Sequence, residues 1–148
     1  MQYIAAILGI FGLEWKIKNH IEKTKTDGQT EEKCGGILLI RKCHNRGAFL
    51  NAGQHRQKVI MILSVWMTIF LTTLFIVTFG IAGKKLLKWG LAFLLGGAYS
   101  NTYDRLVRKY VVDYVSFNVP VGLKNIVFNI SDFCIIIGAL ICVIGRNM

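Results

Sequence analysis

Residues 126–145 read IVFNISDFCIIIGALICVIG, and Asp132 is the one charged side chain among these twenty residues. A helix of about 20 apolar residues spans the hydrocarbon core of a bilayer. The stretch therefore predicts a membrane helix over residues 126–146. A carboxylate inside a membrane costs roughly 3 kcal/mol, so Asp132 is also a candidate functional residue.

Three other apolar stretches accompany this one. Residues 59–82 are long enough to span a bilayer, whereas residues 86–99 and 1–13 must extend into polar neighbours to complete a helix. Of the 148 residues, 53% are hydrophobic, which leaves room for one domain of membrane-type composition. We therefore predict an all-α membrane protein with a single domain, residues 1–148. Its four-transmembrane-helix bundle is expected at about residues 1–21, 57–82, 86–104 and 126–146.

The connection between the first two predicted helices is long and polar. Its residues 23–33 are predicted to form a loop. Residues 36–42 have strand character, because four consecutive apolar residues from Ile37 to Ile40 lie between glycine and basic flanks. We therefore expect a small β insertion at about residues 23–56.

The formal net charge of +10 is concentrated in this region, since residues 14–58 hold ten Lys and Arg against five Asp and Glu. In so apolar a chain, this charge favours attraction to anionic lipid headgroups over nucleic-acid binding. The basic turn at residues 84–88 would lie on the other side of the membrane, so charge alone leaves the orientation open. The Cys and His residues lack metal-ligand spacing, and no metal or cofactor is expected.

Acidic residues are scarce beyond Glu32. Only Asp104, Asp113 and Asp132 remain, against fourteen Lys and Arg in residues 33–148. Two of the three share a local pattern, because Asn101 precedes Asp104 by three residues, as Asn129 precedes Asp132. Residues three apart lie on one helix face, where an amide can hold a carboxylate in one rotamer. Polar contact between helices, ion passage and acid–base chemistry are all compatible with this pattern, and its repetition favours a functional site.

Several sequence blocks resemble those of one family. Residues 96–105 (GGAYSNTYDR), 110–114 (YVVDY) and 128–132 (FNISD) resemble the GGAxGNxxDR, VVDF and FNxAD blocks of lipoprotein signal peptidase (signal peptidase II). Residues 45–49 (NRGAF) resemble the family's NxGAxF block, and Glu14 with Lys18 resembles its D-x-x-x-K pair. The blocks occur in the family's order across nearly the whole chain.

The resemblance implies a membrane aspartyl endopeptidase. Such an enzyme removes signal peptides from prolipoproteins by cleaving before the diacylglyceryl-modified cysteine. It implies that Asp113 and Asp132 are the catalytic pair and that no metal or cofactor is needed. It further implies a set of residues that bind substrate or organise the site: Asn45, Asn101, Asp104, Arg105, Asn129, Glu14 and Lys18.

The resemblance also implies a location and partners. The chain is expected to be a monomeric, multi-pass protein of the bacterial cytoplasmic membrane, with the active site and the β insertion at the extracytoplasmic face. Its expected partners are diacylglyceryl-modified prolipoproteins and membrane lipids, and nucleic acid is not among them.

The chain departs from the family pattern at small but definite points. Ser100 stands in place of Gly before Asn101, Ser131 in place of Ala before Asp132, and Glu14 in place of Asp. Ile17 stands where Thr or Ser is common. None of these changes removes a group expected to be catalytic, although Glu14 has a longer arm than the Asp that it replaces.

Two other functions remain as alternatives. A small proton- or cation-transporting membrane protein would place its Asp residues near mid-membrane, whereas Asp104 and Asp132 fall at predicted helix ends. A non-catalytic paralogue could bind lipidated peptides without cutting them. Loss of Asp113 or Asp132 would be its simplest signature, and both are present.

Overall fold

The computed structural model describes residues 1–26, 28–48, 52–119 and 125–145, so Phe49 of the NxGAxF-like block and residue 146 of the last predicted helix lie outside it. Helices form close to the four predicted positions. They are α1 (Gln2–Thr24), α2 (Gln57–Phe79), α3 (Lys85–Val107) and α4 (Ile130–Gly145). Three strands accompany them: β1 (Thr30–Lys33), β2 (Leu38–Asn45) and β3 (Val111–Phe117).

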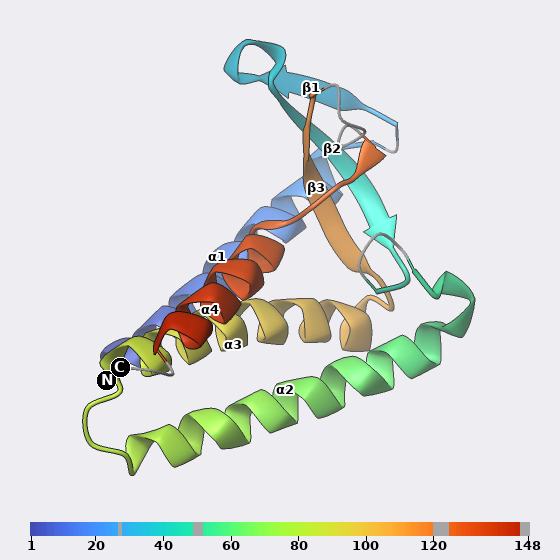
Figure 1. Cartoon of the computed structure of the whole chain (residues 1–148). Coiled ribbons are helices and arrows are strands. Elements are labelled where there is room, and N and C mark those ends of the chain that lie inside the picture. The colour runs from blue at the N-terminus through green and yellow to red at the C-terminus, as the bar shows by residue number, and fades with distance from the viewer. Residues whose placement is uncertain (27, 49–51, 120–124, 146–148) are drawn as a thin grey trace.

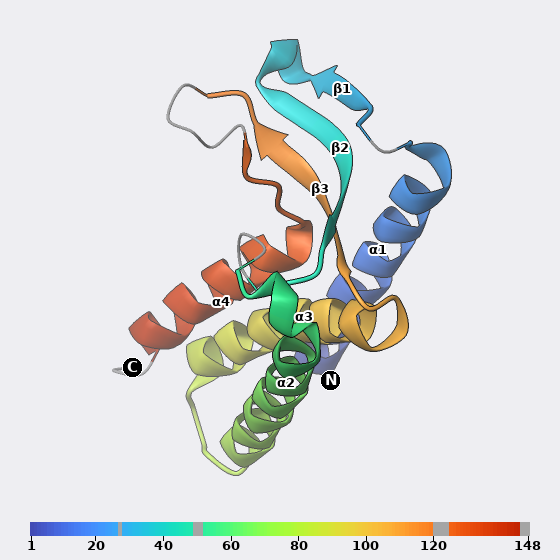
Figure 2. The ribbon, with the colours of Figure 1, turned by 90° about the vertical axis from the view of Figure 1, so that its right-hand side faces the viewer.

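Helix α3 is the centre of the helical part, because α1, α2 and α4 each pack against it. The sheet lies at one end of the helices, and the two termini lie at the other end (Figures 1 and 2). Packing of α3 on α1 and α2 buries a first apolar cluster around Ile7, Phe75 and Leu95. A second cluster, around Ile21, Val112 and Tyr114, joins α1 to the sheet.

The sheet is antiparallel, in the order β1-β2-β3. Strand β2 covers the predicted strand region from Leu38 onward, whereas Gly36 belongs to the short 3-10 turn Cys34–Gly36. Strand β1 occupies residues that were predicted as a loop. Strand β3 comes from the connection between α3 and α4, so the sheet is not confined to an insertion between helices 1 and 2. A register shift between Ile40 and Cys43 of β2 places Cys43 opposite Asp113. Such irregularities re-aim side chains and are frequent beside active sites.

Helix α4 begins at Ile130, four residues later than predicted. Phe128 is held outside the helix because it forms a β-bridge with Val115 of β3. Asn129 then caps the helix: its Oδ1 accepts a hydrogen bond from the Asp132 amide at 3.0 Å. In return, the Asp132 carboxylate accepts a hydrogen bond from the backbone N–H of Asn129 at 3.1 Å. This reciprocal capping box satisfies amides that a helix start otherwise leaves unpaired.

Helices α3 and α4 approach closely at glycine residues. A Cβ on Gly138 would lie 2.6 Å from the Leu94 nitrogen, and a Cβ on Gly97 would lie 2.4 Å from the Ser131 oxygen. Both distances are to backbone atoms, which cannot move aside as a flexible side chain can. Small residues at such crossings let helix backbones meet in membrane proteins.

The outer surface of the helices is strongly apolar. Among the described helices, the stretch Gln54–Phe79, which contains α2, is the one long and apolar enough to cross a membrane. Its exposed side chains include Leu63, Trp66 and Phe70. Helix α4 is apolar but shorter. The four spans of the predicted bundle therefore stay a prediction.

Replacing Gly138 by Ala should destabilise the protein. The added methyl group would meet the backbone of α3, and overpacking of this kind costs about 1–3 kcal/mol. Gly9→Ala in α1 is the matched control, since nothing lies within 4 Å of its Cβ position. Thermal unfolding in detergent should show a lower midpoint for Gly138→Ala than for Gly9→Ala. Equal midpoints would contradict close α3–α4 packing.

Candidate active site

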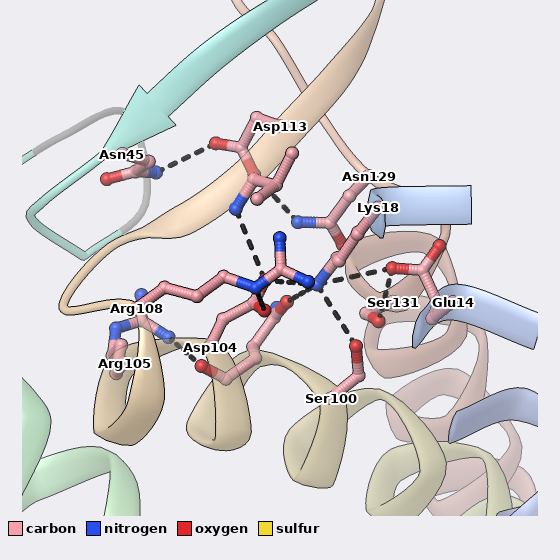
Figure 3. A network of polar contacts seen from close by, with 12 residues as sticks. Glu14, Lys18, Asn45, Ser100, Asp104, Arg105, Arg108, Asp113, Asn129 and Ser131 are labelled. Carbon is pink, nitrogen blue, oxygen red and sulfur yellow. Dashed lines mark hydrogen bonds and ion pairs between the residues drawn. The ribbon is translucent and has the colours of Figure 1, made fainter. Parts of the chain in front are cut away.

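Asp113 lies in β3 and is almost completely buried, with 3% of its surface exposed. Two amides donate hydrogen bonds to its carboxylate. Asn45 Nδ2 binds Oδ2 at 3.0 Å, and Asn129 Nδ2 binds Oδ1 at 2.7 Å. Figure 3 shows the two amides approaching Asp113 from different elements. The Asn45 amide is itself oriented, because its Oδ1 accepts a hydrogen bond from the Gly47 nitrogen at 3.0 Å.

Asp132 lies in the first turn of α4 and is held in a similar way. Asn101 Nδ2 of α3 donates to its Oδ1 at 2.9 Å, while its Oδ2 takes part in the capping box. Lys18 Nζ donates to Asn101 Oδ1 at 3.0 Å, which fixes the direction of the Asn101 amide. Each of the two aspartates thus accepts hydrogen bonds from neutral amides, and further hydrogen bonds fix the orientation of those amides.

The Asn129 side chain connects the Asp113 carboxylate to the backbone of Asp132. Its Oδ1 accepts from the Asp132 backbone, and its Nδ2 donates to Asp113. An amide has distinct donor and acceptor ends, so both bonds require this one orientation. The side chain is completely buried. Asn129 therefore sets where the Asp113 carboxylate lies relative to the start of α4.

A cavity of about 420 Å³ opens beside the two aspartates. Its polar lining comes from Asp113, Asp132, Asn45, Asn101 and Arg105. The apolar lining comes largely from α2 and α4 and includes Leu63, Met67, Ile135 and Ile136. The cavity can therefore accept a segment that is apolar outside its reacting group.

Arg105 supplies a positive charge at this cavity. Its Nη2 donates to the Gly47 carbonyl at 3.0 Å, and Nη1 lies 3.4 Å from the Asn101 carbonyl. Its Nε is buried and has no hydrogen-bond partner in the described part of the chain. A buried donor without a partner is costly, so Nε is a candidate contact for a bound ligand.

Asp104, Lys18 and Glu14 form a buried ionic cluster next to the aspartates. Lys18 Nζ lies 3.0 Å from Asp104 Oδ2 and 3.3 Å from Glu14 Oε2. Arg108 Nε lies 3.1 Å from Asp104 Oδ1, and the Val112 amide donates to Asp104 Oδ2 at 3.2 Å. Asp104 is thus saturated by partners and does not line the cavity. It joins α3 to α1 and to the start of β3.

Burial raises the pKa of Asp113 to about 7, and the nearby charge of Asp132 adds to this effect. The hydrogen bonds from Asn45 and Asn129 act in the opposite direction. Asp113 can therefore hold a proton near neutral pH while a second carboxylate lies beside it. Such a pair can perform general acid–base chemistry, with one member giving and the other taking a proton.

All nine residues singled out in the sequence lie in or next to this site. The cavity is lined by Asn45, Asn101, Arg105, Asp113 and Asp132. Asn129 lies between the two aspartates. The ionic cluster consists of Glu14, Lys18 and Asp104. Sequence reasoning missed Arg108 and Tyr114. The spacing of Asp104 and Arg108, four residues apart with opposite charge, could have indicated the first. No local signal indicated that the Tyr114 hydroxyl reaches Glu14 of α1.

The fold and the site together define a helical protein with a membrane-type helix and two amide-held aspartates beside a cavity, of which Asp113 is buried and Asp132 is partly exposed. Residues 6–146 match the family model of signal peptidase (SPase) II. The chain therefore belongs to the signal peptidase II family. The lipoprotein signal peptidase of Caldicellulosiruptor bescii is 30% identical over 142 residues, which cover 95% of this chain and 87% of that protein. That of Clostridium tetani is 30% identical over 144 residues, covering 97% and 90%.

Two solved structures share the fold. One is a bacterial membrane enzyme with a TM-score of 0.84 and 22% sequence identity, and the match covers 98% of this chain and 87% of that one. Another bacterial membrane enzyme has a TM-score of 0.79 and 23% identity, covering 98% and 92%.

Asp113→Asn should stabilise the protein most at high pH. The pKa of this carboxyl is about 7 in the folded protein, against an ordinary value of 3.8 that applies to the unfolded chain. The folded protein therefore loses stability as the pH rises between these two values, because the carboxyl ionises more readily in the unfolded chain. The effect is on the order of a few kcal/mol, and Asn removes it. Thermal unfolding should show a larger midpoint difference between variant and wild type at pH 8 than at pH 5. The same difference at both values would contradict the raised pKa.

Proposed function

We propose that this chain is an aspartic-type membrane endopeptidase that removes signal peptides from prolipoproteins. It cleaves before the cysteine that carries a diacylglyceryl group, and residues 1–148 act as one domain. The observation that carries the proposal is the pair of aspartates that are linked through Asn129 and line a largely apolar cavity. Membership of the signal peptidase II family supports the substrate class.

The proposed chemistry uses Asp113 and Asp132 as a pair that shares one proton. The ionised member takes a proton from water as the water oxygen attacks the scissile carbonyl. The protonated member donates a hydrogen bond to that carbonyl and then supplies a proton to the leaving amine. Each carboxylate can act in either role, because both are held by amides of similar kind.

The surrounding residues have supporting roles in this proposal. Asn45, Asn101 and Asn129 orient the two carboxylates without adding charge, so the shared proton is not displaced by a neighbouring cation. Arg105 contacts the bound peptide through the Nε that lacks a partner. Glu14, Lys18 and Asp104 hold α1 and α3 in register behind the site.

The proposed setting follows from the apolar helices and from the substrate. The chain is a multi-pass protein of the bacterial cytoplasmic membrane, active as a monomer. An exported prolipoprotein presents its cleavage site outside the cytoplasm, which places the sheet and the aspartates at the extracytoplasmic face. The apolar lining from α2 suits a lipid-linked substrate that reaches the cavity from within the bilayer.

Cleavage of a diacylglyceryl-modified prolipoprotein by the purified protein in nanodiscs tests this function. Asp113→Asn and Asp132→Asn should each abolish cleavage, because each removes a group that gives or takes a proton. Glu31→Gln is a matched control, since this carboxylate lies on β1, half-exposed and paired with Lys25 and Lys33.

The outcomes separate the alternatives. Tight binding of the lipidated substrate without cleavage by well-folded wild type would point to a lipopeptide-binding paralogue. Proton or cation flux across vesicles without cleavage would point to transport. Cleavage that survives either Asp substitution would show that the pair is misassigned.

Asn129→Asp should lower kcat strongly, and because the added carboxylate is buried it should also lower the unfolding midpoint. Asp is an equally good helix cap, but it cannot donate to Asp113 and it adds a negative charge to the pair. Loss of one oriented donor in an active site typically costs roughly 10²-fold in kcat. Steady-state cleavage rates and thermal unfolding should be measured together. A kcat within threefold of wild type would refute the bridging role of Asn129.

A further inference from the structure

Glu14 lies behind the two aspartates and accepts hydrogen bonds from two hydroxyl groups. Tyr114 OH donates to Oε1, and Ser131 Oγ donates to Oε2 at 2.9 Å (Figure 3 shows the Ser131 contact). All three side chains are buried, with at most 4% of their surface exposed. None of them lines the cavity beside Asp113 and Asp132.

These contacts join the immediate neighbours of the two aspartates. Tyr114 follows Asp113 in β3, and Ser131 precedes Asp132 in α4. Successive side chains of a strand point to opposite faces, so Tyr114 points away from the side on which Asp113 lies. Tyr114 OH also accepts a hydrogen bond from the Ile130 amide at 3.4 Å. The elements that carry the aspartates are therefore tied together on a second side, opposite the Asn129 bridge.

The length of Glu14 is matched to this arrangement. Each of its two oxygens takes one hydroxyl, and Lys18 Nζ balances its charge at 3.3 Å. An Asp at this position would end one methylene earlier and could not keep both contacts. The two donors also depart from the family patterns, because VVDF and FNxAD have Phe and Ala at the positions of Tyr114 and Ser131.

We propose that Glu14, Tyr114 and Ser131 act as positioning residues that set the separation of Asp113 and Asp132. We call these three residues the Glu14 cluster. The inference rests on the proposed function, in which the two carboxylates must share a proton across a fixed distance. The Glu14 cluster acts through the backbone of its neighbours and has no contact with the substrate.

The test is a set of variants assayed for cleavage of a diacylglyceryl-modified prolipoprotein. Glu14→Asp leaves one or both hydroxyls unpaired and should lower kcat roughly tenfold, because small misplacements of reacting groups have large effects on rate. KM should stay within twofold, since the cavity lining is unchanged. Tyr114→Phe and Ser131→Ala are assayed singly beside Glu14→Asp. Tyr3→Phe is the control for Tyr114→Phe, because Tyr3 lies near the other end of α1.

A triple variant separates positioning from simple loss of stability. Glu14→Asp combined with Tyr114→Phe and Ser131→Ala keeps the shorter acid but removes the two hydroxyls that it leaves unpaired. The result is the Asp, Phe and Ala combination of the D-x-x-x-K, VVDF and FNxAD patterns, in which neither hydroxyl needs a partner. Its kcat should exceed that of Glu14→Asp alone by threefold or more. A kcat equal to the product of the single-variant losses would overturn the proposal, as would single variants that lower the unfolding midpoint but keep wild-type kcat.

A second measurement does not depend on cleavage. The chain contains four aspartates, so selective ¹³C labelling of Asp carboxyl groups gives a simple NMR spectrum. The Asp113 and Asp132 signals, assigned with their Asn variants, should shift in Glu14→Asp and return toward wild type in the triple variant. Unshifted signals would overturn the proposal. Failure of wild type to cleave would refute the proposed function alone, because these signals would still test the Glu14 cluster.

Discussion

A buried ammonium group constrains the whole arrangement. Lys18 is 1% exposed, and its Nζ lies within 3.3 Å of Glu14, Ser100, Asn101 and Asp104. Removing a charge from water costs several kcal/mol unless partners replace the lost hydration. Those partners come from α1 and α3, so the two helices must meet at this level. Because Asp104 also binds the start of β3, the same constraint positions the strand that carries Asp113.

The aspartates themselves are held differently from Asp104. Asp104 has two cations beside it, whereas Asp113 and Asp132 accept hydrogen bonds from amides. A cation at hydrogen-bond distance would favour the ionised form and drive off a proton. Amides orient a carboxylate with a smaller effect on its charge. The site thus separates a carboxylate paired with two cations, which supports the fold, from two carboxylates that are held by amides.

Sequence reasoning predicted the positions of the helices and named residues that the structure brings together, because both were indicated by local patterns. Apolar runs located the four helices, and the family-like blocks located Asp113, Asp132 and their amide partners. The start of α4 was misplaced because Phe128 is as apolar as a helical residue, and only its bridge to Val115 removes it from the helix. Strand β1 was missed because its residues are polar and charged, and it forms only by pairing with the neighbouring β2. The contact of Tyr114 with Glu14 was missed because the two residues lie 100 positions apart in the chain. The amide orientations in the site follow from three-dimensional contacts that no spacing rule contains.

The sheet and the site are assembled from segments that lie far apart in the sequence. Asn45 and Asp113 are separated by 68 residues, and Glu14 and Ser131 by 117. During synthesis the first two strands emerge long before β3 and α4 exist. Asp113 and Asp132 therefore cannot come together until the last helix has been made, so a nascent or C-terminally truncated chain has no assembled site. Any activity that depends on these two aspartates is therefore absent until α4 has been made.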